Sequence, residues 1–475
     1  MAWAALQKYS AMGIQFISGI ILARLLTPYD YGCIGMLTIF MVLAEAFIDG
    51  GFGSALIQKK RPTQEDYSTI FYWNLGVALL MYAVLYFCAP AIARFYDIPL
   101  LCDVLRVQGL VLFIYAFNIV QRNQLKKQLN FKVLSIVTIT TSIIALSVTI
   151  VLAYKGFGVW ALVVQHLITA AIPAVVFWFF IKWRPKLVFS WKSFKELFSF
   201  GFYMFLTNLL NQLGNQIQGL LIGRVYDSST MGYYSKAKST EELASTSISG
   251  VMGQVTYPLY AECQHDLPVL INVIKRITIS IAYLTFPIMA LLFLLAKPIF
   301  VLLYSERWLE SVPYFQILCI AGIAISLQGV NYLAVAAVGK SKQMFTWTVV
   351  KRVVGLLFVV SGLILGGIWG LLVGMVLQSW LIYFINSFQV HKYIGYKITR
   401  QMQDLLPIVV LSLIAFIAAF LAGDYFSVLN MYPLAIIQLF VFVIIYLGGS
   451  MLMKMESFKY VRETIPLVFG KFKRN

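Results

Sequence analysis

Long apolar segments recur from end to end of this chain and constrain its fold more than any other feature. Each covers about 18 to 25 residues, and an α-helix of that length crosses a hydrocarbon core about 30 Å thick. Of the 475 residues, 60% are hydrophobic and 12% are charged, with a mean hydropathy of +0.83. A soluble domain of this size has no use for so much apolar surface. The sequence therefore predicts an all-α polytopic membrane protein.

The spans are placed by hydropathy and by the polar loops between them. We predict about fourteen, at residues 8–26, 33–57, 69–90, 103–122, 133–154, 159–181, 203–224, 231–256, 271–296, 312–334, 344–366, 368–390, 405–422 and 432–453. Residues 1–20 lack a charged n-region and a small-residue cleavage site. The first apolar segment is therefore expected to be a retained helix rather than a removed signal peptide.

The basic residues are distributed in a pattern that argues against a nucleic-acid partner, despite a formal net charge of +18. Lys and Arg gather in every second loop, for example at residues 59–61, 122–132 and 182–195. This alternation follows the positive-inside rule and predicts that both termini are cytoplasmic. It also favours contact with anionic membrane lipid. The scattered cysteines and histidines form no CxxC or HExxH motif, so we expect no disulfide framework and no metal site.

An internal repeat predicts how the helices are organised. "ARLLTPYDYG" (23–32) matches "GRVYDSSTMG" (223–232), and "GVWALV" (158–163) matches "GIWGLL" (367–372) at the equivalent point of the topology. We infer two parallel six-helix lobes, at residues 1–185 and 186–400. Two further helices at 401–453 and a basic cytoplasmic tail at 454–475 follow them. In parallel-repeat transporters the binding cavity lies between the lobes near the midplane.

A stripe of amides crosses the seventh predicted span. Spacings of three and four residues place them on one helix face, roughly 140° wide at 100° per residue. They are Asn208, Asn211, Gln212, Asn215 and Gln216. Interhelical hydrogen bonding is one explanation. Five amides exceed what one packing contact needs, so we favour a wetted wall that binds substrate, and sugar hydroxyls suit groups that both donate and accept.

Charged residues enter the eighth predicted span together: Lys236, Lys238, Glu241 and Glu242. Lys238 and Glu242 are four residues apart and can form a self-neutralising pair. Lys236 has Thr240 at that spacing, so it is a candidate anion-binding charge. Glu241 and Glu242 are candidate carriers of a coupling ion.

Glu45 and Asp49 share one face of the second predicted span. A carboxyl group held in a low-dielectric site can exchange a proton or bind a cation during transport. Alternatively, these acids form salt bridges with Lys236, Lys238 or the pair Lys351-Arg352. The neighbouring residues Gly50, Gly51 and Gly53 permit close helix approach or local unwinding.

Arg24 and Arg224 occupy matching positions at the ends of the two lobes' first helices. We interpret them first as loop anchors or an outer gate, and second as substrate ligands. "AAVGKSKQ" lacks the first glycine of a P-loop, so we expect no ATP site and no cofactor, and transport would be secondary.

Five segments carry a resemblance to a known family. They are "LARLLTPYDYGCIGM" (22–36), "FIDGGFGSALIQKK" (47–60), "TIFYWNLGVALL" (69–80), "APAIARFYDIPLLCDVLRVQGL" (89–110) and "FSFGFYMFLTNLLNQLGNQIQGLLIG" (198–223). The chain resembles the bacterial oligosaccharide flippases of the Wzx type, in the branch with about fourteen helices. The resemblance covers most of the chain and weakens after residue 400. Such proteins are similar to multidrug and toxin extrusion transporters and to the lipid II flippase.

The resemblance implies a function in the bacterial cytoplasmic (inner) membrane. An undecaprenyl-diphosphate-linked sugar repeat unit would move to the outer leaflet during synthesis of O-antigen, capsule or exopolysaccharide. The amides would face the glycan and Lys236 and Lys238 the diphosphate, with a proton or sodium gradient as the driving force. Polysaccharide polymerase machinery is a candidate partner. Two alternatives stay open: a cation-coupled multidrug exporter of the same fold, and a glycan polymerase or ligase, which would need a larger outer loop.

Overall fold

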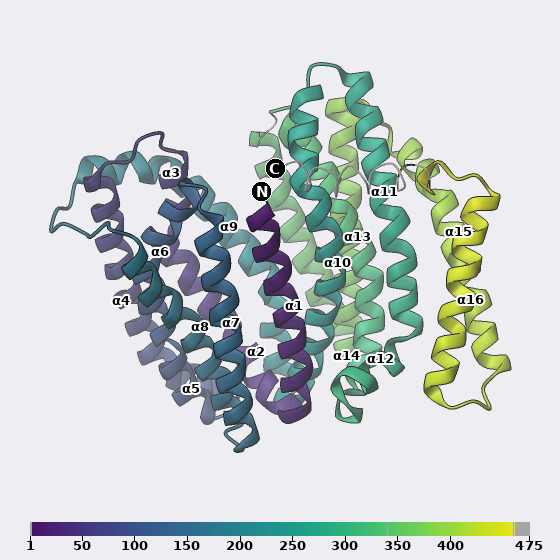
Figure 1. Cartoon of the computed structure of the whole chain (residues 1–475), viewed down its shortest axis with the longest axis horizontal. Helices are drawn as coiled ribbons and strands as arrows, with labels where there is room; N and C mark the ends of the chain where they lie inside the picture. The colour runs from purple at the N-terminus through teal and green to yellow at the C-terminus, as the bar shows by residue number, and fades with distance from the viewer. Residues whose placement is uncertain (1, 340, 459, 461–475) are drawn as a thin grey trace. The chain divides into compact units, whose positions relative to one another are not determined.

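The computed structural model describes residues 2–339, 341–458 and 460 (Figure 1). These residues form helices and no β-strand, which confirms the predicted all-α class. The earlier helices are α1 (Ala2–Leu25), α2 (Pro28–Asp49), α3 (Phe52–Gln58), α4 (Gln64–Phe95), α5 (Leu100–Gln108), α6 (Leu110–Lys127), α7 (Phe131–Tyr154), α8 (Val159–Phe180) and α9 (Trp191–Val225). The later ones are α10 (Ser228–Cys263), α11 (Leu267–Leu294), α12 (Ala296–Tyr304), the 3-10 helix η1 (Glu306–Trp308), α13 (Ser311–Ala337), α14 (Ser341–Ile394), α15 (Ile398–Tyr425) and α16 (Met431–Leu452).

The helices pack as two compact units, which we call unit 1 (residues 1–235) and unit 2 (residues 236–475). The boundary falls inside α10. Unit 1 extends beyond residue 185 because α9 packs against α2 and α3. The lobes at 1–185 and 186–400, and the segments at 401–453 and 454–475, were inferred from the repeat and the charge pattern, and they stay a prediction.

The described residues contain 10 helical segments long and apolar enough to span a membrane. One of these segments, Thr346–Ile394, covers two predicted spans. Helices α1, α9 and α10 fall outside the set because polar side chains lower their hydropathy. The chain is a multi-pass membrane protein, and the count of about fourteen spans stays a prediction.

Two consecutive glycines break the second predicted span. Gly50 and Gly51 have φ angles of 52° and 77°, so α2 ends at Asp49 before them and α3 begins at Phe52 after them. A Cβ on Gly51 would lie 2.0 Å from the carbonyl oxygen of Gly201 in α9. Glycine is required here both for the left-handed backbone and for the close approach of α9. The expected unwinding and close approach are both confirmed.

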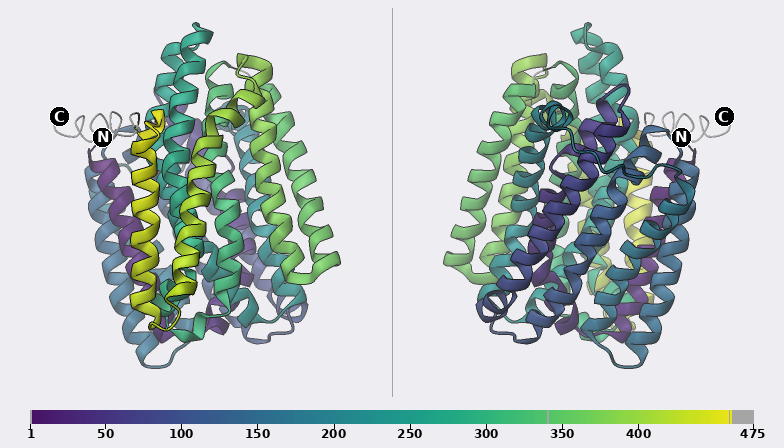
Figure 2. Two further views of the ribbon diagram at one scale, coloured as in Figure 1. Left: turned by 90° about the vertical axis from the view of Figure 1, so that its right-hand side faces the viewer. Right: turned by 90° about the vertical axis from the view of Figure 1, so that its left-hand side faces the viewer.

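A second break divides α14. Gly367 has a φ of 58°, and the helix folds back at this residue so that its two halves lie side by side (Figure 2). A Cβ on Gly362 would lie 2.2 Å from the carbonyl oxygen of Gly370, and a Cβ on Gly370 would lie 2.1 Å from the carbonyl oxygen of Gly362. The break coincides with the expected boundary between the spans at 344–366 and 368–390.

The internal repeat has a structural counterpart inside unit 1. A Cβ on Gly32 would lie 1.7 Å from the carbonyl oxygen of Ser228, the first residue of α10. A Cβ on Gly232 would lie 1.9 Å from the carbonyl oxygen of Pro28, the first residue of α2. The glycine in the first turns of α2 therefore lies against the first carbonyl group of α10, and the glycine in the first turns of α10 lies against the first carbonyl group of α2. This reciprocity supports the equivalence of residues 23–32 and 223–232.

The last two described helices, α15 and α16, lie side by side at the yellow end of the chain (Figures 1 and 2). Buried tyrosines join α16 to α11. The Tyr446 hydroxyl donates to the Tyr283 carbonyl oxygen at 2.8 Å, and the Tyr283 hydroxyl donates to Ser450 Oγ at 2.9 Å. These bonds satisfy polar groups inside an otherwise apolar cluster of unit 2.

Candidate functional site

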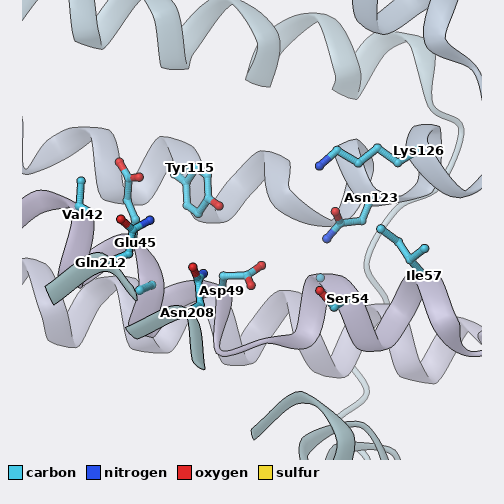
Figure 3. Close-up of a pocket in the computed structure, with 12 residues that line it drawn as sticks. Val42, Glu45, Asp49, Ser54, Ile57, Tyr115, Asn123, Lys126, Asn208 and Gln212 are labelled. Carbon is cyan, nitrogen blue, oxygen red and sulfur yellow. The ribbon is translucent and has the colours of Figure 1, made fainter. Parts of the chain in front are cut away.

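A polar cavity of about 340 Å³ lies within unit 1. Four helices supply its walls: α2, α3, α6 and α9. The lining residues are Val42, Glu45, Ala46, Asp49, Gly53, Ser54, Ile57, Tyr115, Asn123, Lys126, Asn208 and Gln212 (Figure 3). Carboxylate, ammonium, amide and hydroxyl groups share one enclosure, so the cavity can bind a polar ligand by several hydrogen bonds at once.

The acids of α2 line one wall, as their spacing predicted. Glu45 and Asp49 are one helical turn apart and both face the cavity (Figure 3). The backbone N–H groups of Gly51 and Gly53 lie close enough to the Asp49 carboxylate to stabilise its charge. A Cβ on Gly53 would lie 2.7 Å from Asp49 Oδ1. The helix break thus gives Asp49 donors that a continuous helix would have used internally.

The opposite wall is formed by α6, and the sequence analysis did not predict it. Tyr115, Asn123 and Lys126 project from this helix toward Glu45 and Asp49 (Figure 3). Lys126 acts electrostatically on Asp49. Arg122, on the same helix, acts on Glu45. The cavity acids therefore have a cationic counterpart on α6.

The predicted span ends at residue 122, which places Arg122 and Lys126 at the loop. The helix continues to Lys127. The signal that could have revealed the wall is the polar series Tyr115, Asn123 and Lys126, with spacings that repeat on one helix face.

The amide stripe of α9 reaches the cavity only in part. Asn208 and Gln212, one turn apart, line it. Asn211, Asn215 and Gln216 are not among the lining residues. Residues spread over roughly 140° of a helix surface cannot all face one cavity. The two lining amides are therefore the ones that the structure brings together with Glu45 and Asp49.

Short helix α3 has a charged side chain at each end. Asp49 lies beside the backbone N–H groups at its start. The Lys127 ammonium donates to the carbonyl oxygens of Leu56 and Ile57 at 3.0 Å each and to that of Lys59. A carboxylate at the N-terminus and an ammonium at the C-terminus both complement the helix dipole. The position of α3 beside the cavity thus depends on two charges.

The loop after α3 is held by Lys59. Its Nζ lies 3.0 Å from Asp66 Oδ2 and 3.0 Å from Glu196 Oε2. Burial alone would lower the pKa of Lys59, but the hydrogen bonds to Glu196 and Asp66 outweigh it and raise that pKa. This ion pair ties α4 to the start of α9.

The charged residues of α10 do not line the cavity; they lie in unit 2. Lys236 Nζ is 4.0 Å from the centroid of the Tyr304 ring and 5.7 Å from that of Trp308. The side chain is only 4% exposed. Cation–π contact with two buried rings is a structural environment for this lysine. Its assignment to a diphosphate, and that of Lys238, stay predictions.

The acids of α10 differ from each other. Lys238 Nζ lies 3.9 Å from Glu242 Oε1, which is the self-neutralising pair expected from their spacing. Glu241 is 2% exposed, and a Cβ on Gly322 of α13 would lie 2.3 Å from its Oε1. Glu241 therefore packs against the backbone of a neighbouring helix. Ion coupling through Glu241 or Glu242 stays a prediction.

The two helix-end arginines have separate surroundings. Arg224 Nη1 lies 3.4 Å from Asp97 Oδ2, and its guanidinium carbon is 5.1 Å from the Phe95 ring centroid. These contacts match a loop anchor after α4. Arg24 is exposed in the last turn of α1. Neither arginine lines the cavity.

Several known bacterial proteins resemble the chain over most of its length. It is 26% identical over 347 residues to the teichuronic acid biosynthesis protein TuaB of Bacillus subtilis (strain 168), covering 73% of this chain and 72% of TuaB. It is 26% identical to the succinoglycan biosynthesis transport protein ExoT of Rhizobium meliloti (strain 1021), and the match covers 82% of this chain and 80% of ExoT. It is 21% identical to the lipopolysaccharide biosynthesis protein WzxC of Escherichia coli (strain K12), and the match covers 81% of this chain and 78% of WzxC.

Solved structures agree on the fold. The lipid II flippase MurJ in an inward closed conformation matches with a TM-score of 0.77 at 15% identity, covering 95% of this chain and 99% of MurJ. An inward-facing multidrug resistance MATE family transporter matches with a TM-score of 0.62 at 16% identity, covering 81% of this chain and 94% of the transporter. At such identities the likeness shows the fold alone, and it confirms the predicted multidrug and toxin extrusion-like architecture.

One family model, described as "Polysaccharide biosynthesis protein", matches residues 21–313. The matched region includes every helix that lines the cavity and the predicted resemblance motifs at 22–36, 47–60 and 198–223. The predicted Wzx-type resemblance is thus confirmed, and the chain belongs to the polysaccharide biosynthesis protein family.

Proposed function

We propose that this protein is a flippase rather than an enzyme. It moves an undecaprenyl-diphosphate-linked oligosaccharide repeat unit from the cytoplasmic to the outer leaflet of a bacterial inner membrane. The product would serve surface polysaccharide synthesis, as O-antigen, capsule or exopolysaccharide. Support comes from the family match and from a relative whose name is that of a transport protein.

The observation that carries the proposal is the polar cavity of unit 1. Asn208, Gln212 and Asn123 supply amides that both donate and accept hydrogen bonds, as sugar hydroxyls require. Lys126 supplies a cation that can meet a phosphate oxygen. The polyprenyl chain needs no cavity, because it can stay in the surrounding lipid.

The same cavity contains the groups we propose for coupling. Glu45 and Asp49 lie beside the amides, so binding of a proton or sodium ion changes the charge that the substrate meets. Asp49 also holds the start of α3. Neutralising its carboxylate would weaken that contact and let α3, which supplies Gly53 and Ser54 to the wall, change position.

The proposed orientation has both termini in the cytoplasm. It rests on the positive-inside distribution of Lys and Arg at residues 59–61, 122–132 and 182–195. Cytoplasmic polymer precursors would enter from that side. Polysaccharide polymerase machinery at the opposite face is the partner this direction of transport requires.

Flipping in proteoliposomes tests the proposal. A fluorescent undecaprenyl-diphosphate oligosaccharide is reconstituted with the protein, and an external quencher reports which leaflet it occupies, with and without an imposed pH or sodium gradient. We expect protein-dependent exchange between leaflets that responds to one of the gradients. Absence of exchange with several glycans, by protein shown to be folded, would contradict the proposal. Transport of hydrophobic cations instead would favour the multidrug-exporter alternative.

A further inference from the structure

A second hollow lies on the outside of α4 and has no part in the polar cavity. Its volume is about 310 Å³, and it is lined by Tyr72, Trp73, Gly76, Val77, Leu80 and Phe189. The lining is apolar and aromatic, with none of the charged or amide groups of the first cavity. A Cβ on Gly76 would meet no atom within 4 Å, so the glycine leaves the floor of this groove open.

The groove is preformed, because hydrogen bonds hold the segment that carries Phe189. Gln64 Nε2 donates to the Arg184 carbonyl oxygen at 2.7 Å. The backbone N–H of Lys186 donates to Ser68 Oγ at 3.1 Å, and that of Ser190 donates to Thr69 Oγ1 at 3.0 Å. These bonds run along the first turns of α4. They place Phe189 over the outer face of the helix without help from a ligand.

Aromatic contacts stiffen the rim further. The Phe189 ring is 5.1 Å from the Trp191 ring and 6.2 Å from the Phe194 ring, centroid to centroid. Phe194 in turn packs 4.5 Å from Trp73, a lining residue. A groove whose walls support each other loses little entropy when it is filled.

Hydrocarbon surrounds this face of the protein. Helix α4 is a membrane-span candidate, and only 17% of its most apolar window is buried against other parts of the chain. The outward-facing Leu79 and Leu80 are 59% and 57% exposed. A hydrocarbon chain is therefore the ligand that this groove meets.

Basic residues mark the polar end of the groove. Residues 182–195 contain five exposed cations and no acid: Lys182, Arg184, Lys186, Lys192 and Lys195. Between them lie Leu187 and Trp191, which are 93% and 63% exposed. Apolar side chains flanked by lysines are typical of segments that lie in the membrane interface and attract anionic headgroups.

We propose that this groove binds an anionic phospholipid, with one acyl chain over Gly76 and the phosphate at Lys186 and Lys192. The dimensions fit. The lining residues Tyr72 and Leu80 are separated by about 12 Å of helix at 1.5 Å per residue. That length fits within one leaflet of hydrocarbon, about 15 Å. A phospholipid acyl chain has this reach, whereas a polyprenyl chain is far longer than the groove.

Photolabelling of the full-length protein tests the site. The protein is reconstituted with phosphatidylglycerol or phosphatidylcholine carrying the same diazirine-labelled acyl chain, and labelled peptides are mapped by mass spectrometry. We expect phosphatidylglycerol to label the peptide containing residues 72–80 at least about fivefold more than phosphatidylcholine does. Gly76→Phe should abolish this labelling by filling the groove. Lys186→Gln with Lys192→Gln should remove the preference for phosphatidylglycerol and keep the acyl labelling.

The matched control is Gly448→Phe on α16, where an added Cβ also meets no atom within 4 Å. It should leave the labelling of residues 72–80 unchanged, and size-exclusion elution in detergent checks that each variant is folded. Equal labelling by the two lipids would overturn the anionic headgroup, and labelling that survives Gly76→Phe would overturn the groove. Displacement of phosphatidylglycerol by a polyprenyl diphosphate would assign the groove to that lipid and overturn the proposal.

Discussion

Two groups of intramembrane acids have similar sequence contexts and different surroundings. Glu45 and Asp49 in unit 1 face a polar cavity, and Asp49 lies beside the backbone N–H groups of Gly51 and Gly53. In unit 2, Glu241 packs against Gly322, and Glu242 lies near Lys238. The difference comes from the backbone. The α2–α3 segment is broken at Gly50 and Gly51, which frees N–H groups, whereas α10 is continuous around its acids and has none to offer.

The comparison teaches that a charged residue in a membrane helix acquires its role from what surrounds it. An acid beside a helix break, amides and a lysine can exchange an ion while its neighbours compensate the charge. We expect an acid that packs against a helix backbone, or that is paired with a lysine four residues away, to contribute less to ion coupling. Transport assays on matched variants of the two units test this distinction.

The largest difference should be seen when the acids are neutralised. Asp49→Asn with Glu45→Gln should reduce the gradient response of flipping by at least about tenfold, equivalent to about 1.4 kcal/mol. The shapes of the side chains are kept, and the amide oxygen introduced by Asp49→Asn can still accept from Gly51 and Gly53. Glu241→Gln with Glu242→Gln should keep most of the response. Flipping with and without an imposed gradient measures both, and full gradient-driven transport by the first pair would rule out the coupling site.

The amides should have the next largest effect. Asn208→Leu with Gln212→Leu removes hydrogen-bonding groups from the cavity wall, so the initial flipping rate should fall about tenfold. Gln165→Leu is the matched control. Its amide bonds Ser18 at 3.3 Å, within unit 1 and outside the cavity, so the rate should stay within about twofold. Equal rates for all the proteins would show that the cavity does not bind the glycan.

Replacing a cation in each unit should change the flipping rate by a smaller factor. Lys126→Gln removes the ammonium of the cavity and should lower the flipping rate roughly fivefold, because a charge-assisted phosphate contact is lost. Lys236→Gln removes a cation that lies over Tyr304 and should change the rate by less than about twofold. An equal or larger loss in the Lys236 variant would move the diphosphate contact to unit 2, as the sequence alone suggested.

The last prediction concerns the stability of the protein rather than transport, and it tests the helix break. Gly51→Ala adds a Cβ at a φ of 77° and 2.0 Å from the Gly201 carbonyl oxygen, so it should destabilise the protein by about 1–3 kcal/mol. The apparent melting temperature in detergent measures this. Gly76→Ala, where the Cβ meets no atom within 4 Å, is the control and should melt like the wild type. Identical melting of the two variants would mean that α9 does not need its close approach at Gly51.

Much of the fold was predictable because bilayer hydrocarbon imposes strong local rules. Span length follows from membrane thickness, Gly50 and Gly51 indicated local unwinding, and the break at Gly367 falls on a predicted span boundary. Glu45 and Asp49 were assigned to one face by spacing alone. The α6 wall was missed because Arg122 and Lys126 follow the positive-inside pattern, which makes loop cations and cavity cations look alike in a sequence.

The all-α membrane class, the internal repeat and the family resemblance follow from the sequence, because periodicity and composition are properties of the chain along its length. The packing of the helices brings Asn208 and Gln212 to one cavity with Glu45, Asp49 and Lys126, and it places Lys236 beside Tyr304. Those partners come from helices far apart in the chain. Which of them meet depends on how α2, α6 and α9 pack and on where Gly50 and Gly51 redirect the backbone, and helical spacing carries no information about either.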